Sequence, residues 1–130
     1  MALVKTDAAA PPYPGLGQRL SSGALPLLAK EGYSYGPLID DLIRLHPQHV
    51  VRTTAESAQM ARMIEAGRAG WMIMAPEEAD ALFASIGDAA RALRLVPLPG
   101  VPPGQTRHLY CNRSVPADVI ERLDRALLER

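Results

Sequence analysis

A turn rich in glycine and hydroxyl groups offers the clearest chemistry in this chain. Residues 32–37 read Gly-Tyr-Ser-Tyr-Gly-Pro, and Pro37 suits the first turn of a helix because that position needs no N–H. A helix start has unsatisfied N–H groups that bind carboxylates or phosphates. We therefore predict a ligand-binding turn formed by Tyr33, Ser34, Tyr35 and Gly36. The alternative interpretation is a plain turn in which Ser34 only caps the helix.

A second helix start is predicted at Pro76, followed by Glu77 and Glu78. Acidic residues in a first helical turn usually stabilise the helix dipole, so the pair does not indicate catalysis. If the turn at 33–36 holds an anion, Glu77 is the further ligand contact that we expect.

The remaining reactive side chains do not form a recognisable catalytic or metal-binding pattern. His46 and His49 lie on either side of Pro47, so they cannot share a helical face. His108 and Cys111 have an odd strand spacing, which directs their side chains to opposite faces. No G-x-G-x-x-G loop is present. Residues 32–36 match the letters of a G-x-S-x-G elbow around Ser34, but no histidine lies at a readable spacing that would pair it with Ser34 as a base. We predict no catalytic residue, no metal and no cofactor.

The net charge and the length of the apolar stretches argue against two classes of partner, nucleic acids and membranes. Fourteen basic and fourteen acidic residues give a formal net charge of zero, so we expect no binding to nucleic acid. The longest apolar stretches, such as residues 71–76, are far shorter than the roughly 20 residues that span a bilayer, so we expect no membrane insertion. A single cysteine permits no internal disulfide. The hydrophobic content of 48% is enough for one domain with its own core.

The elements that must position the turn come after residue 23. Residues 1–23 are expected to be an arm or linker, because prolines and glycines at 11–17 disfavour regular structure, with at most a short helical turn at 18–20. Residues 24–130 are expected to form a single α/β domain. Its predicted strands are 24–29, 50–53, 70–74, 93–98 and 105–111, and its predicted helices are 37–45, 55–66, 76–86 and 116–129.

Short apolar strands alternating with amphipathic helices are typical of a three-layer α/β sandwich with a mostly parallel sheet. A capping box of Thr53 and Glu56 is expected to start the helix after the second of these strands. Ligands in such folds bind beyond the carboxyl ends of the strands. The loops at 31–37, 53–56 and 74–78 are therefore the expected location of a site.

The order of these segments resembles one part of the type 2 periplasmic binding protein superfamily, the substrate-binding proteins of amino-acid-type ABC transporters. Residues 32–39 are similar to the glycine and tyrosine turn that opens the second lobe in that family. Residues 54–69 are similar to its helix ending in glycine and arginine, and residues 76–79 to the proline and glutamate start of its next helix. The segments at 94–98, 107–111 and 115–128 resemble its return strands and last helix.

This resemblance implies a solute-binding domain, one lobe of a transporter substrate-binding protein, that takes a small polar or anionic solute at a helix N-terminus. Ala75 stands where amino-acid binders carry an aspartate, which argues against a standard α-amino acid. The implied partners are the missing first lobe or a transporter permease. An unpaired lobe also exposes its cleft face, so we expect a homodimer built on Tyr33, Tyr35 and Trp71 or on a swapped N-terminal arm.

Two other functions remain open from the sequence. The same fold serves as a ligand-sensing regulatory module in larger signalling or transcription proteins, and a few relatives are dehydratases. The chain shows no paired acid and base for catalysis, so we expect no enzyme activity. The implied location is periplasmic if the chain is part of an exported protein, although from its first residues we expect no signal peptide in this chain.

Overall fold

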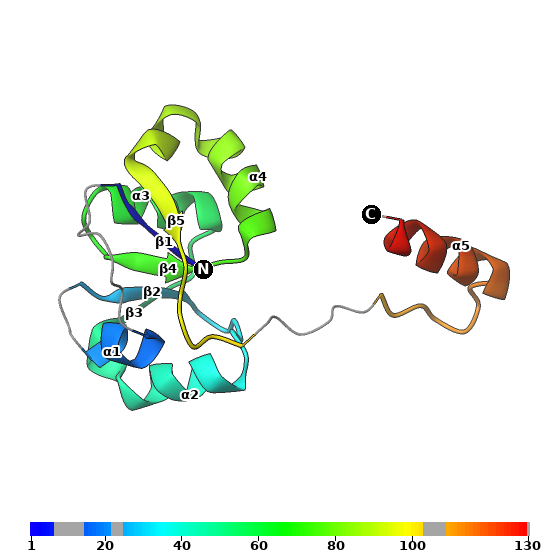
Figure 1. Cartoon of the computed structure of the whole chain (residues 1–130), viewed down its shortest axis with the longest axis horizontal. Helices are drawn as coiled ribbons and strands as arrows, with labels where there is room; N and C mark the ends of the chain where they lie inside the picture. Colours follow the sequence, from blue (N-terminus) through cyan, green and yellow to red (C-terminus); the bar gives the residue numbers. More distant parts are fainter. Residues whose placement is uncertain (7–14, 22–24, 103–108, 130) are drawn as a thin grey trace.

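The computed structural model describes residues 1–6, 15–21, 25–102 and 109–129, and shows a five-stranded sheet with helices on both faces (Figure 1). In chain order the elements are β1 (Ala2–Lys5), α1 (Leu16–Ser21), β2 (Leu27–Lys30), α2 (Pro37–Leu45), β3 (Val50–Thr53), α3 (Ser57–Glu65), β4 (Trp71–Ile73), α4 (Pro76–Ile86), β5 (Leu93–Val96) and α5 (Ala117–Leu128). Two 3₁₀ turns, Pro47–His49 and Gly87–Ala92, precede β3 and β5. The predicted α/β class is confirmed.

The prediction of a mostly parallel sheet is wrong, because β1 enters it antiparallel and the sheet is mixed, with strand order β3-β2-β4-β1-β5. β2 runs parallel to both β3 and β4, whereas β1 lies antiparallel between β4 and β5. The register places Ala2 beside Ile73 on one side and beside Val96 on the other. Four strands therefore point the same way, and their carboxyl ends meet at one edge of the sheet.

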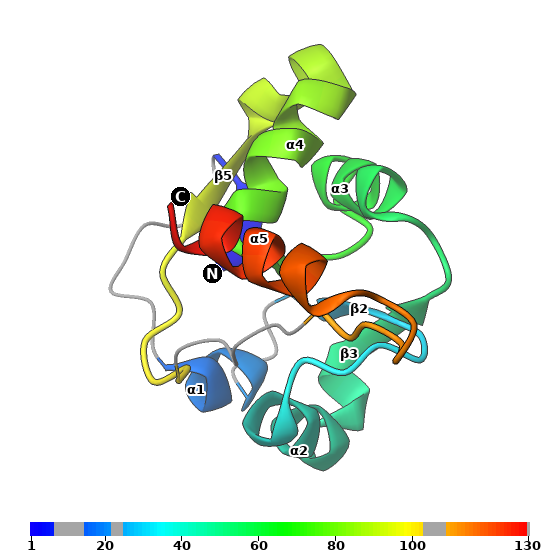
Figure 2. The same ribbon diagram turned by 90° about the vertical axis from the view of Figure 1, so that its right-hand side faces the viewer.

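Two apolar clusters make the domain three-layered. On one face, Leu28 and Met72 of the sheet pack with Ile64 of α3 and Leu82 of α4. On the other face, Leu27 and Trp71 pack with Leu20 of α1 and Ile39 of α2. Figures 1 and 2 show the same division, with α1 and α2 on one side of the sheet and α3 and α4 on the other.

Local sequence explains where the helices begin. Pro37 and Pro76 are the first residues of α2 and α4, as predicted, since the first helical N–H has no acceptor in the helix. The capping box predicted for α3 is wrong. The Thr53 hydroxyl accepts instead from the Ala55 N–H at 3.1 Å, and Glu56 takes the N-cap position without a side-chain cap.

Gly70 sits at a close approach between two chain segments. Its N–H donates to the Pro26 carbonyl at 2.9 Å, and a Cβ at this position would collide with Leu25. Only glycine fits here without a shift of the backbone. This contact brings the start of β4 beside β2, which pairs Trp71 with Leu27.

The expected arm at residues 1–23 is wrong for its first residues. Ala2–Lys5 is a strand inside the sheet, and Ala2, Leu3 and Val4 are completely buried. The helical turn expected at 18–20 is part of α1, which buries Leu20 against Trp71 and α2. Residues 7–14 and 22–24, also expected in the arm, lie outside the described residues.

The last predicted strand, 105–111, falls mostly outside the described residues, and residues 109–111 are not in a strand. The amphipathic helix that follows is present as α5, but it has no buried residue. Figure 1 shows α5 standing apart from the sheet and the other helices.

The burial of β1 predicts a large stability loss from Leu3→Ala. The side chain is 0% exposed in the α3 and α4 cluster, so its truncation should lower the free energy of unfolding by about 2–5 kcal/mol. Leu128→Ala is the matched control, because Leu128 is 86% exposed and should change stability by less than about 0.5 kcal/mol. Urea denaturation measures both, and equal losses would contradict the position of β1.

Candidate functional site

A broad, open pocket of about 1230 Å³ lies at the edge of the sheet where the four codirectional strands end. Lys30 ends β2 and Ile73 ends β4, and both line the pocket. Val101 and Pro102, which follow β5, form another part of the wall. A pocket of this size holds a small molecule, but its open side leaves part of that molecule in water.

Three helices begin at this pocket. Pro37, Leu38 and Ile39 come from the start of α2, Ser57 from the start of α3, and residues 76–78 from the start of α4. None of these three helix starts has a side-chain cap. The first N–H groups of a helix have no acceptor within it. Pro37 and Pro76 have no N–H and the Glu78 N–H donates to the Ala75 carbonyl at 3.2 Å, so the backbone donors at the pocket are the other N–H groups of these first turns.

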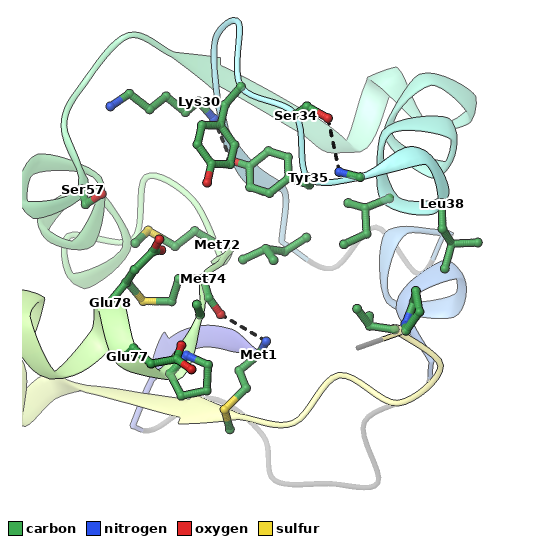
Figure 3. A pocket seen from close by; sticks show the side chains of 18 of the residues that line it. Met1, Lys30, Ser34, Tyr35, Leu38, Ser57, Met72, Met74, Glu77 and Glu78 are labelled. Carbon is green, nitrogen blue, oxygen red and sulfur yellow. Dashed lines mark hydrogen bonds between the residues drawn. The ribbon is translucent and has the colours of Figure 1, made fainter. Parts of the chain in front are cut away.

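All five predicted ligand contacts line this pocket. Tyr33, Ser34, Tyr35 and Gly36 form one wall beside α2, and Glu77 comes from α4. Figure 3 shows Ser34 and Leu38 on one side of the pocket, with Glu77 and Met74 across from them. The structure therefore brings together residues that are more than forty positions apart in the sequence.

The hydrogen bonds of the turn differ from the expected arrangement. The Ser34 hydroxyl donates to the Asp40 carboxylate at 2.6 Å, and the Tyr35 N–H donates to the same carboxylate at 2.9 Å. The Gly36 N–H donates to the Ser34 hydroxyl oxygen at 3.3 Å. These groups already have partners inside the protein. The unsatisfied donors of α2 are the N–H groups of Leu38 and Ile39, one turn further on.

Ser34 is therefore not the N-cap of α2. Gly36 occupies that position with a φ of 97°, a conformation that glycine adopts without strain. Asp40, which the sequence reasoning missed, is the residue that holds the turn. Its position six residues after Ser34 was the available signal, since an acid in the first turn of a helix can reach back to N–H groups before it.

Tyr35 has a structural contact of its own. Its hydroxyl accepts from the Lys30 N–H at 3.0 Å, which ties the turn to the end of β2. Burial raises the pKa of the Tyr35 phenol, and the hydrogen bond from Lys30 opposes that rise. The Tyr33 ring lies edge-on to it at 5.0 Å and is itself half exposed. Tyr33 thus presents more of its surface to a ligand than Tyr35 does.

The charged side chains around the pocket are mixed. The Lys30 ammonium forms an ion pair with Glu56 at 2.9 Å, while Glu77 and Glu78 lie across the pocket on α4. Two carboxylates beside the helix starts oppose the binding of multiply charged anions. Backbone N–H groups carry only partial positive charge, unlike a lysine or arginine side chain. They therefore suit a single carboxylate or a neutral hydrogen-bond acceptor.

Methionines form the apolar part of the pocket. Met60, Met72 and Met74 line it and are largely buried, and they also belong to the core beneath. Their flexible thioethers give the site an adaptable apolar floor.

No group of three His, Cys, Asp or Glu side chains that could hold a metal occurs in the described part of the chain. Among the same residues, no helix is both long and apolar enough to cross a bilayer. Comparison of the sequence with protein-family models finds no match, and comparison with curated proteins also finds none. The site must therefore be interpreted from its own geometry.

The Asp40 contacts predict a turn that loosens at low pH. Hydrogen bonds from Ser34, and then from the Tyr35 N–H, hold the pKa of Asp40 below its usual value. A lowered pKa in the folded state stabilises the turn above the unfolded pKa, near pH 4, and the stabilisation is lost as pH falls through the folded pKa. Hydrogen exchange of the Tyr35 amide, corrected for its intrinsic pH dependence, should accelerate in that range.

Asp40→Ala should produce the same loosening at neutral pH, with less than about 1 kcal/mol lost in overall stability because the carboxylate is solvent-accessible. Asp41→Ala is the matched control, since Asp41 pairs with Arg44 at 2.8 Å and has no bond to the turn. Unchanged exchange at Tyr35 in the Asp40 variant would refute this role.

Proposed function

We propose that this chain is a solute-binding domain, one lobe of a transporter substrate-binding protein, and that it recognises a small polar or singly anionic solute in the pocket at the ends of the strands. The observation that carries the proposal is the meeting of three uncapped helix starts, those of α2, α3 and α4, at one open pocket. Backbone donors without protein partners favour a ligand that brings acceptor oxygens.

The five predicted contacts have distinct roles in this proposal. Tyr33 offers an exposed ring, and Glu77 accepts from a hydroxyl or amine on the solute. Ser34, Tyr35 and Gly36 shape the wall through their bonds to Asp40 and Lys30, so that the N–H groups of Leu38 and Ile39 face the ligand. The family resemblance of the ordered segments, stated above, points to the same class of protein.

The hydrogen-bonded pair of Ser34 and Asp40 favours a binding function over catalysis. Ser34 donates to Asp40, but hydrogen bonds lower the pKa of that carboxylate. A carboxylate of low pKa is a weak general base near neutral pH. The pair therefore suits a fixed turn rather than an activated nucleophile.

The open side of the pocket implies a partner. A solute held from one side keeps much of its hydration and is bound weakly. In this proposal a first lobe covers the open side, and a transporter permease receives the loaded protein. Self-association through Trp71 is not part of the proposal, because Trp71 is 2% exposed and lies under the Arg19 guanidinium.

The pocket assignment predicts weak solute binding that Ser57→Trp removes. Ser57 is exposed at the first position of α3, so an indole there should fill the pocket without disturbing the core. Calorimetric titration of the parent with small carboxylates, neutral polar solutes and phosphate should give dissociation constants on the order of 1 mM for a preferred carboxylate or neutral solute. Phosphate should bind least.

Gln59→Trp is the matched control, because Gln59 is exposed on the same helix but does not line the pocket. It should bind as the parent does. The site assignment fails if no solute binds the parent, or if the Ser57 variant, still folded by circular dichroism, binds like the control.

A further inference from the structure

α5 carries an apolar stripe that no other described part of the chain covers. Ile120, Leu123 and Leu127 are spaced three and four residues apart, so they lie on one face of the helix, and we call them the α5 stripe. Their side chains are exposed, and no residue of α5 is buried. An isolated helix of twelve residues is marginal in water, so α5 needs a packing partner to be stable.

A second uncovered stripe lies on the outer side of α2. Leu38, Leu42 and Leu45 follow a spacing of four and three, and we call them the α2 stripe. Leu38 and Leu45 are exposed, while Leu42 is partly covered by α1. Gly17 of α1 lies beside Leu42, so this residue of α1 has no side chain that covers Leu42.

The two stripes are complementary in length and spacing. Each presents three branched aliphatic side chains along two turns of helix, which is the geometry in which the ridge of one helix packs into the groove of another. Arg122 and Arg125 lie on the opposite side of α5, and Asp124 borders the stripe. Packing α5 on an α2 stripe therefore buries apolar surface, leaves Arg122 and Arg125 in water and places Asp124 at the edge of the contact.

We propose that α5 docks on the α2 stripe of a second copy of this chain, and that the exchange is reciprocal. The area supports two contacts rather than one. A helix of twelve residues is about 18 Å long and about 10 Å across, so one helix pair covers only a few hundred Å² on each partner. A single α5 pair falls below the roughly 1,200 Å² of a stable specific interface, whereas two reciprocal contacts approach it.

The connection permits the exchange. Fifteen residue steps separate Pro102 from Ala117, and an extended chain of that length spans up to about 50 Å. Pro102 and Leu38 both line the pocket, so the chain that leads to α5 leaves from the same region as the α2 stripe. A docked α5 from the second copy would stand beside the open side of the pocket. The assembly does not depend on what the pocket binds.

Two single substitutions test this exchange by sedimentation velocity over a concentration series. Leu123→Asp removes the centre of the α5 stripe, and Leu45→Asp puts a charge at the end of the α2 stripe. The parent should dimerise, and each variant should dimerise at least tenfold more weakly. Neither side chain is buried, so both variants should remain folded, which thermal unfolding of each variant verifies.

Mixing the two variants should restore part of the dimer, because α5 of the Leu45 variant can dock on α2 of the Leu123 variant. Leu128→Asp is the matched control, since Leu128 is 86% exposed on the same helix but lies off the stripe, and it should dimerise like the parent. A monomeric parent at every concentration would overturn the proposal. It would also be overturned if either stripe variant kept the parent's affinity, because α5 would then pair with another α5, or α2 with another α2.

Discussion

The architecture depends on the insertion of β1 between β4 and β5. β5 pairs with β1 along its whole length, from Lys5 beside Leu93 to Ala2 beside Val96, and the strand order gives β5 no other neighbour. Without β1, β5 would lose its backbone pairing and would be held only by the packing of Leu93 and Val96 in the two apolar clusters. The antiparallel direction of β1 also allows β4 and β5 to run the same way, which places the end of β5 at the pocket edge. The wall formed by Val101 and Pro102 is a consequence of this pairing.

The parts of the fold that follow from local sequence were predictable. The helices α2, α3, α4 and α5 have apolar residues at helical spacing, and prolines mark two of their starts. β1 was not predictable in this way, because Ala2, Leu3 and Val4 form too short a run to show a period. Its role is set by pairing with residues about seventy and ninety positions away, and no local pattern encodes such pairing.

In the candidate site too, one feature was predictable from local sequence and another was not. Its location was predictable, because strands of one direction bring their carboxyl ends to one edge and the loops at 31–37 and 74–78 follow those ends. The hydrogen bonds of the turn were not. The Asp40 carboxylate, in the first turn of α2, accepts from the Tyr35 N–H, and the Tyr35 hydroxyl accepts from the Lys30 N–H. Both hydrogen bonds require the full geometry of the turn. The position of a binding turn is thus easier to infer than which of its donors remain available to a ligand.

The open pocket and the uncovered helix share a cause in the order of the chain. After β5 closes the sheet, the chain passes the pocket at Val101 and Pro102 and ends in an amphipathic helix that buries nothing. The periodicity of α5 is a local property and predicts that some apolar surface will cover it, but it carries no information about which surface. Within the described residues, the α2 stripe has the matching length and lies beside the same pocket through Leu38. In the proposed exchange, α5 of one copy lies beside Leu38 at the pocket of the other copy, so the proposed assembly and the proposed solute site share one region of the molecule.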